Sequence, residues 1–166
     1  MDEKKWYVVK TNPRAEKLVS KRLTEIKIEN YVAVKKTLKQ WKDRKKWVDE
    51  VLIKSYVFVK TTERTKNDVF KVFGITRFLF FAGKLAVITE NEIEVLKIFC
   101  EIKEIKIEKK GFETGDKVQV ISGLLIGMVG VLNTNQKGSK ISIYIEQLGL
   151  FANIKIDISD VLIFVE

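Results

Sequence analysis

The sequence predicts an α+β protein in two parts: a mixed strand-and-helix region over residues 1–107 and a small five-stranded β-barrel over 113–166. Helical spacing and strand alternation of apolar residues both occur in the first part, whereas the second has only short strand patterns separated by turns. The first 110 residues carry 27 basic and 16 acidic side chains, and the rest carry 4 and 6. This charge division indicates two domains with different partners, the first near a polyanion.

The composition excludes most classes of catalytic site. The 166 residues include no histidine and one cysteine, Cys100, which removes Ser/His and Cys/His nucleophile pairs and a structural zinc site. No glycine motif that cradles phosphate occurs, so we expect no enzyme, no metal and no cofactor. Membrane-spanning and signal-peptide patterns are also absent. The lone cysteine excludes an intramolecular disulfide and fits a reducing cytosol, and we expect a cytoplasmic monomer.

A strand over 5–10 leads into a helix with one apolar stripe. Asn12 suits the N-cap, and Pro13 is tolerated at the first helical position. Basic and polar residues lie beside the stripe, and they are Lys10, Asn12, Arg14, Lys17, Lys21 and Arg22. They form either a nucleic-acid surface or an ordinary solvated helix face.

After a strand over 30–34, the segment 35–49 has the pattern of a basic hairpin. It holds seven basic residues against two acidic ones, with two tryptophans interleaved. A turn over 42–45 presents Lys42, Arg44 and Lys45. Projecting cations with indole rings suit backbone phosphates and unstacked bases. The alternative is a solvated hairpin whose tryptophans fold back on the sheet.

In the strand over 55–60, aromatic residues alternate with valines. A period of two places Tyr56 and Phe58 on one face and Val57 and Val59 on the other, where the valines hold the sheet to its helices. The rings lie either in a strand buried on both faces or in an exposed docking patch. The charge division, the lack of catalytic side chains and the order of motifs favour the exposed patch.

The rest of the first part contains two further helices. A short helix over 67–73 has Phe70 and Phe73 on its apolar side, and a strand over 77–81 follows it. A capping box beginning at Thr89 starts the second helix, whose Cys100 is expected to be a buried apolar residue. The five strands of the second part are expected at 117–121, 128–133, 140–146, 151–156 and 161–165. In the third, isoleucine at every other position indicates a core face.

Residues 115–132 resemble a KOW motif, in which two strands flank a glycine-bearing turn. The glycines of the motif fall on Gly123, Gly127 and Gly130, where positive φ and a tight bend are expected. Leu124 and Leu125 replace the usual Pro-Phe, a departure that affects contacts of the loop rather than the fold.

The order of motifs resembles NusG-type transcription elongation factors along essentially the whole chain. The resemblance in the first part rests on residues 5–9, the helix containing Glu16, 55–59 and 75–78. Residues 77–84 and 120–123 are more similar to the specialised UpxY-type antitermination paralogues of capsular-polysaccharide operons, whose better-known analogue is RfaH. Where NusG proteins have Phe-Pro-Gly before the docking tyrosine, this chain has Ile53-Lys54-Ser55.

This resemblance implies an N-terminal α/β sandwich (an antiparallel sheet with flanking helices), a linker over 108–112 and an SH3-like KOW barrel. The first domain would bind the clamp helices of the largest RNA polymerase subunit, bridge the DNA cleft and suppress pausing and termination. The docking tyrosine falls on Tyr56 and a second aromatic on Phe58. Further candidates for polymerase binding are Tyr7, Phe70 and Phe73.

The resemblance also implies contact with the non-template DNA strand or the nascent RNA. At the positions where the family makes these contacts, this chain has basic or polar residues of similar but not identical type. They are Lys10, Asn12, Arg14, Lys21 and Arg22. The KOW domain would recruit a ribosomal protein or a termination factor. The alternative function is a ribosome-associated or general RNA-binding KOW protein that uses the basic hairpin.

Overall fold

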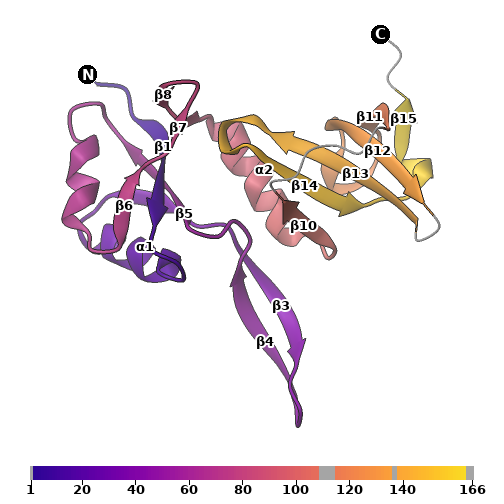
Figure 1. The fold of residues 1–166 in the computed structure, drawn as a ribbon, viewed down its shortest axis with the longest axis horizontal. Helices are drawn as coiled ribbons and strands as arrows, with labels where there is room; N and C mark the ends of the chain where they lie inside the picture. The colour runs from indigo at the N-terminus through magenta and orange to yellow at the C-terminus, as the bar shows by residue number, and fades with distance from the viewer. Residues whose placement is uncertain (1, 109–114, 136–137, 164–166) are drawn as a thin grey trace. The chain divides into compact units, whose positions relative to one another are not determined.

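The computed structural model describes residues 2–108, 115–135 and 138–163, and the chain divides into two compact units, Met1–Cys100 and Glu101–Glu166 (Figure 1). Antiparallel strands dominate both units, and the predicted α+β class is confirmed. The division falls before the expected boundary at 107, because the strand Ile105–Glu108 (β10) pairs with a strand of the second unit. Apart from its first residue, the expected linker 108–112 lies outside the described residues.

The first unit is built on a five-stranded antiparallel sheet with the order β2-β5-β1-β6, in which β9 also pairs with β1. Its strands are β1 (Lys5–Thr11), β2 (Glu29–Tyr31), β5 (Tyr56–Thr61), β6 (Ile75–Phe78) and β9 (Val87–Ile88). Two ribbons accompany it, β3 (Val34–Gln40) with β4 (Lys45–Val51) and β7 (Phe80–Phe81) with β8 (Lys84–Leu85). Its helices are α1 (Glu16–Glu25), α2 (Glu90–Glu101) and a short 3-10 helix, Lys66–Lys71.

One face of the sheet packs against α1. Val57 and Val59 of β5 are fully buried in a cluster with Val19 and Leu23 of α1, so the predicted role of the two valines is confirmed. The 3-10 helix closes the same core through the buried Val69. Burial of such aliphatic side chains is the main force that holds a helix to a sheet.

The other face is covered by α2, whose buried residues are Ile93, Leu96 and Phe99. Trp6 of β1 donates a hydrogen bond to Glu90 at the start of α2 (2.7 Å). The hydroxyl of Tyr31 lies 3.6 Å from the sulfur of Cys100 at the other end. Phe58 lies on this face and is 0% exposed. The predicted exposure of Phe58 is therefore wrong, because its ring belongs to the core between β5 and α2.

The start of α1 also differs from the prediction. Asn12 is not the N-cap, and the helix begins later, after Ala15. A turn precedes it, in which the amide of Ala15 donates to the carbonyl of Asn12 (3.1 Å) and Arg14 adopts a left-handed φ of 63°. The capping box of α2 is confirmed, since Thr89 and Glu92 exchange hydrogen bonds through both side chains and both amides.

The second unit is a six-stranded antiparallel sheet with the order β10-β14-β13-β12-β11-β15. The five expected strands are β11 (Asp116–Val120), β12 (Val129–Asn135), β13 (Gly138–Ile145), β14 (Leu150–Lys155) and β15 (Val161–Ile163). The sixth, β10, was not predicted. It lies along β14, where the carboxylate of Glu108 accepts a hydrogen bond from the side-chain amide of Asn153 (3.1 Å). The alternating Ile141, Ile143 and Ile145 of β13 are buried as predicted.

The three glycines of the predicted turn serve two different purposes. Gly123 and Gly127 have left-handed φ values of 76° and 86°, which side-chain-bearing residues rarely adopt. Gly130 has no such φ, so the predicted positive φ is wrong there. A Cβ at Gly130 would lie 2.7 Å from the carbonyl oxygen of Ser142, so this glycine instead permits close approach of β12 to β13.

Candidate functional site

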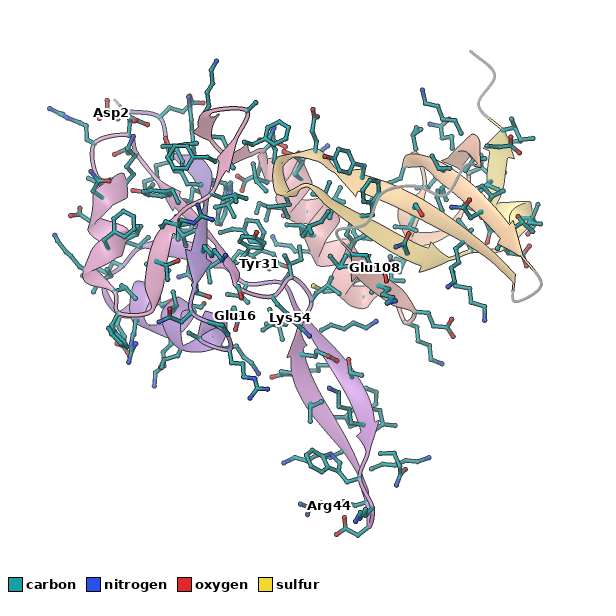
Figure 2. All side chains as sticks on the ribbon, in the orientation of Figure 1. Asp2, Glu16, Tyr31, Arg44, Lys54 and Glu108 are labelled. Atoms are coloured by element: carbon teal, nitrogen blue, oxygen red, sulfur yellow. The ribbon has the colours of Figure 1, made fainter. Side chains whose placement is uncertain are left out.

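The ribbon of β3 and β4 is the main basic projection of the first unit, and Figure 1 shows it extending away from the five-stranded sheet. Its turn closes with a hydrogen bond from the amide of Trp41 to the carbonyl of Arg44 (2.8 Å). Lys42, Arg44 and Lys45 are exposed at this tip, where Figure 2 labels Arg44. The predicted basic hairpin is therefore present, with its cations directed to solvent.

The two tryptophans of the ribbon do not fold back onto the sheet. Trp41 is 56% exposed and Trp47 is 66% exposed. Trp47 lies directly opposite Leu38 in the ribbon, and Trp41 follows the last residue of β3 at the turn. The ribbon thus carries two exposed indoles in a segment rich in lysine, a combination that suits stacking on unpaired bases beside phosphates.

A basic side chain of α1 lies against β4 of the ribbon. Lys17 donates a hydrogen bond to the backbone carbonyl of Asp49 in β4 (2.8 Å). Lys21 is exposed, and Arg22 donates to the carbonyl of Phe73 (2.8 Å) while its guanidinium lies 5.7 Å from the centre of that ring. Lys17 therefore connects α1 with β4 of the ribbon, whereas Arg22 contacts Phe73.

Lys10 and Asn12 lie at the end of β1 and join the same region through their backbones. The amide of Asn12 donates to the carbonyl of Gly74 (2.9 Å), and the hydroxyl of Thr76 donates to the carbonyl of Lys10 (3.0 Å). The side chain of Asn12 is exposed and Lys10 is half-buried. These bonds connect the start of α1 with the start of β6.

The aromatic candidates do not form one patch. Phe58 and Tyr7 are buried on opposite faces of the sheet. Tyr56 is half-buried on the face covered by α2, whereas Phe73 lies beside Arg22 of α1 and is 79% exposed. Phe70 is 45% exposed and packs edge-on against Phe78 of the α1-side core. Of the five aromatic candidates, Tyr56, Phe70 and Phe73 keep surface that a partner could contact, with Tyr56 on a different face from the other two.

A polar cluster ties α2 to β1 and β5, the two inner strands of the sheet. Glu90 accepts hydrogen bonds from the indole of Trp6 (2.7 Å) and the ammonium of Lys60 (3.3 Å), and these bonds lower the pKa of the Glu90 carboxyl. The bond to Glu90 in turn raises the pKa of Lys60. Burial raises the pKa of Tyr31, with a further contribution from its contact with Cys100. We call Trp6, Lys60 and Glu90 the α2 clasp.

Burial also raises the pKa of a second tyrosine, Tyr7, on the opposite face of the sheet. It raises the pKa of the Tyr7 hydroxyl to about 12, and the hydrogen bond to Glu63 (2.8 Å) adds to that shift. Tyr7 therefore behaves as a neutral structural residue at physiological pH.

Sequence reasoning missed one basic residue of this region. Lys54 is exposed in the connection from β4 to β5 and lies beside a hollow at the start of α1. Its position within Ile53-Lys54-Ser55, where the family pattern has Phe-Pro-Gly, was the available signal. Within the described ranges, no cluster of three or more potential metal ligands occurs, and no helix is both long and apolar enough to cross a membrane.

Comparison with known proteins identifies the family. Residues 4–97 match the family model described as transcription termination factor NusG, which is more than half of the chain. The chain belongs to the NusG family. It is 29% identical over 147 residues to the transcription termination/antitermination protein NusG of Chlamydia trachomatis serovar D, covering 78% of this chain and 77% of that protein. The corresponding Rickettsia bellii protein is 25% identical over 172 residues, covering 96% and 90%.

A solved structure shares the fold. The structure titled "Domain interaction in Thermotoga maritima NusG" superposes with a TM-score of 0.62 at 24% identity and covers 98% of both chains. This structural similarity, which covers nearly the whole chain, supports the predicted fold. The chain is thus a member of a family of transcription termination/antitermination factors, and the prediction that it is not an enzyme is confirmed by that membership.

Proposed function

We propose that this NusG-family protein is a transcription elongation and antitermination factor that binds RNA polymerase through its first unit. It bridges the DNA cleft, stabilises the closed enzyme and suppresses pausing and termination, and it acts on specific operons such as those for capsular polysaccharide. The basic ribbon β3–β4 with two exposed indoles carries the proposal, because it is suited to nucleic acid at the edge of a polymerase.

Tyr56 is the proposed contact with the clamp helices of the largest polymerase subunit. It is half-buried, so part of its ring remains available while the rest is held by the sheet. Phe70 and Phe73 offer a second aromatic surface beside Arg22. A few aromatic anchors of this kind commonly dominate the energy of an interface. Phe58 and Tyr7 are left out of the proposal, because both are buried.

The proposed nucleic-acid contacts, with the non-template DNA strand or the nascent RNA, lie along α1 and the ribbon. They are Lys10, Asn12, Arg14, Lys21, Arg22, Lys42, Arg44 and Lys45. The region from 113 to 166 is proposed to be a KOW domain that recruits a ribosomal protein or a termination factor. We propose a cytoplasmic monomer, in which residues 1–107 provide the polymerase-binding domain.

In vitro transcription with purified polymerase tests this function directly. The template carries the upstream leader of the operon that encodes the chain, followed by a terminator. We expect the protein to increase readthrough and shorten pauses, because a bridged cleft resists opening. Unchanged readthrough and pausing on this template would contradict the proposal.

A second candidate, a general RNA-binding protein, is favoured by the same basic ribbon. It predicts binding to RNA without any polymerase. Counterion release makes such binding fall steeply as salt rises, whereas an aromatic contact with polymerase is much less sensitive to salt. RNA binding that persists in full without polymerase, combined with no effect on transcription, would favour this alternative.

A further inference from the structure

The first strand of the second unit, β10, is an addition to the edge of its sheet. Among the described residues it stands at one end of the strand order, next to β14 and with no strand on its other side. It has four residues, Ile105–Glu108, and it precedes in the chain the five strands that the sequence predicts for this unit. The edge that β10 covers therefore belongs to a sheet of five other strands.

β10 is packed more loosely than the strand it covers. Ala152 and Ile154 of β14 are 0% and 2% exposed. Their partners in β10, Ile107 and Ile105, are only half-buried, and Lys106 between them is exposed. A short strand at the rim of a sheet with little buried apolar surface has the features of an element that opens locally while the rest of a domain stays folded. We therefore expect β10 to detach without unfolding the sheet.

One hydrogen bond gives the direction of the backbone groups across this edge. The amide of Lys155 donates to the carbonyl of Glu104 (3.5 Å). Residues directly opposite in an antiparallel ladder alternate between bonded and non-bonded pairs, so the register makes Lys106 with Asn153 a bonded pair. The backbone amide of Asn153 therefore faces β10, and the amide of Lys106 faces β14.

A side-chain donor is also directed across the edge. The carboxamide oxygen of Asn153 accepts a hydrogen bond from the hydroxyl of Ser142 in β13, which is buried. The carboxamide nitrogen donates to the carboxylate of Glu108 (3.1 Å), which Figure 2 labels. The bond from Ser142 thus orients the carboxamide of Asn153 toward the chain that lies along β14. Without β10 this half-buried donor would lose its acceptor, which is unfavourable.

Detachment of β10 would uncover a site for another extended chain. Unpaired backbone groups at a sheet edge are a template for the addition of a strand. The side-chain donor of Asn153 would favour an acidic residue at the position that Glu108 occupies. Apolar residues would be favoured at the positions of Ile105 and Ile107, because their partners in β14 are buried.

We infer that β10 is a detachable strand that closes the β14 edge against a partner protein. In the open state, an extended segment of the partner pairs with β14 in place of β10. This segment has two apolar residues separated by one position and followed by an acidic residue, the pattern of β10 itself. Because the two strands compete for one edge, the apparent affinity is the intrinsic affinity multiplied by the fraction of molecules in which β10 is detached. The inference goes beyond the proposed function, since it needs neither polymerase nor nucleic acid.

Amide hydrogen exchange of the full chain, followed by NMR, tests detachment in the wild type. The amide of Lys106 and the amide of Asn153, which face each other's strand, should lose protection when β10 opens. The amide of Ile154 faces β13 and should keep its protection. After correction for intrinsic rates, we expect the first two to exchange at least about tenfold faster than the third. Equal rates for all three would overturn the inference, because β10 would then open only with the whole sheet.

Competition for the edge is tested with a fluorescein-labelled peptide that has the sequence of residues 101–108. Lys106→Pro removes the amide that faces β14 and so weakens the pairing of β10. The matched variant Lys106→Gln removes the same charge and its ion pair with Glu108 but keeps the amide. By fluorescence anisotropy, we expect Lys106→Pro to bind the peptide about tenfold more tightly than Lys106→Gln or the wild type. Equal affinities of the three proteins, or no binding by Lys106→Pro, would overturn the inference.

A second opened variant keeps the test independent of proline. Ile105→Ser with Ile107→Ser removes the apolar contacts of β10 and should also bind the peptide about tenfold more tightly than the wild type. Thermal melting checks that each variant is folded. A peptide with serine in place of the same two isoleucines should bind the opened variants at least about tenfold more weakly. Equal binding of the two peptides would show attachment without strand pairing and would overturn the inference.

A second copy of the chain is the other occupant that the edge could take. Size-exclusion chromatography with light scattering over a concentration series distinguishes it, and we expect the opened variants to remain monomers. A dimer that the peptide dissociates would assign the edge to β10 of another copy and would overturn the inference of a partner protein. The peptide assay contains no polymerase, so its failure leaves the readthrough test of the proposed function unaffected, and failure of readthrough leaves the peptide result unaffected.

Discussion

At the scale of single residues, Phe58 and Tyr56 lie on the same face of one strand but differ in how deeply they are buried. Tyr56 and Phe58 share one face of β5, as a period of two requires. Phe58 lies near the ring of Tyr31, with centroids 6.1 Å apart, and has no exposed surface. Tyr56 is half-buried. The same alternation therefore places one ring in the core and leaves the other partly available to a partner.

Truncation of these two rings should have opposite consequences. We expect Phe58→Ala to lower the free energy of unfolding by about 3–5 kcal/mol, because it leaves a cavity under α2. Tyr56→Ala should cost much less stability and instead weaken association with polymerase. Urea unfolding and a polymerase pull-down measure the two effects. A stable Phe58→Ala protein, or a Tyr56→Ala protein that binds normally, would contradict these assignments.

At the scale of an element, the α2 clasp explains how a helix is fixed over an aromatic face. Trp6 and Lys60 both donate to Glu90, the first residue of α2. Because these bonds favour the ionised carboxylate, the pKa of Glu90 is lower in the folded chain than in the unfolded one. Glu90 therefore contributes its full stabilisation at pH values above the ordinary pKa of a glutamate carboxyl. This stabilisation is lost as the pH falls through the lower pKa of Glu90 in the folded chain.

The clasp predicts a pH-dependent effect of Glu90→Gln. At neutral pH the variant should melt at a lower temperature than the wild type, and this difference should shrink as the pH is lowered below the ordinary carboxyl range. Thermal melting over a pH series measures it. Glu25→Gln, the same change at an exposed position of α1, controls for loss of a charge alone. Identical pH behaviour of the two variants would exclude a special role for the clasp.

The ribbon β3–β4 is a second element whose role can be tested separately. We expect Lys42→Gln, Arg44→Gln and Lys45→Gln together to lower the salt slope for single-stranded DNA by about 2, if each cation neutralises one phosphate. A control triple at exposed lysines elsewhere, Lys4→Gln, Lys27→Gln and Lys140→Gln, should leave the slope nearly unchanged. Fluorescence anisotropy over a salt series gives both values. Equal slopes for the two triples would remove the ribbon from the nucleic-acid surface.

At the scale of the whole molecule, the charge division follows the two structural units. Residues 1–100, the first unit, hold 23 basic and 13 acidic side chains, whereas residues 101–166 hold 8 and 9. The basic ribbon and the basic residues of α1 belong to the first unit. A polyanion is therefore expected to bind the first unit, and the second is left for a partner of another kind.

This division predicts different salt responses for the two proposed partners of the full chain. Binding to free single-stranded nucleic acid should fall by orders of magnitude between about 0.05 and 0.5 M salt. Capture of polymerase should fall much less, because aromatic contacts are not screened. Parallel pull-downs at the two salt concentrations compare the responses. An equally steep loss of polymerase would indicate that charge rather than aromatic docking holds the complex.

Local patterns in the sequence were sufficient for most elements of the fold. The alternation in β5 and β13 identified their buried valines and isoleucines, and Thr89 with Glu92 located the start of α2. Such features depend on neighbours within a few residues, so they are visible in one dimension. The site was less predictable: the basic ribbon was found, whereas Lys54 at its base was missed, and two of the aromatic candidates, Phe58 and Tyr7, are buried.

By itself, the sequence determined the class of fold, the order of the longer strands and helices, the NusG resemblance and the basic hairpin. The tertiary structure decided which surfaces remain free. It placed α2 over Phe58, paired Ile105–Glu108 with β14 and brought Lys54 to the start of α1. These outcomes depend on contacts between residues far apart in the chain, and a periodic pattern records only that a face is apolar, not what covers it.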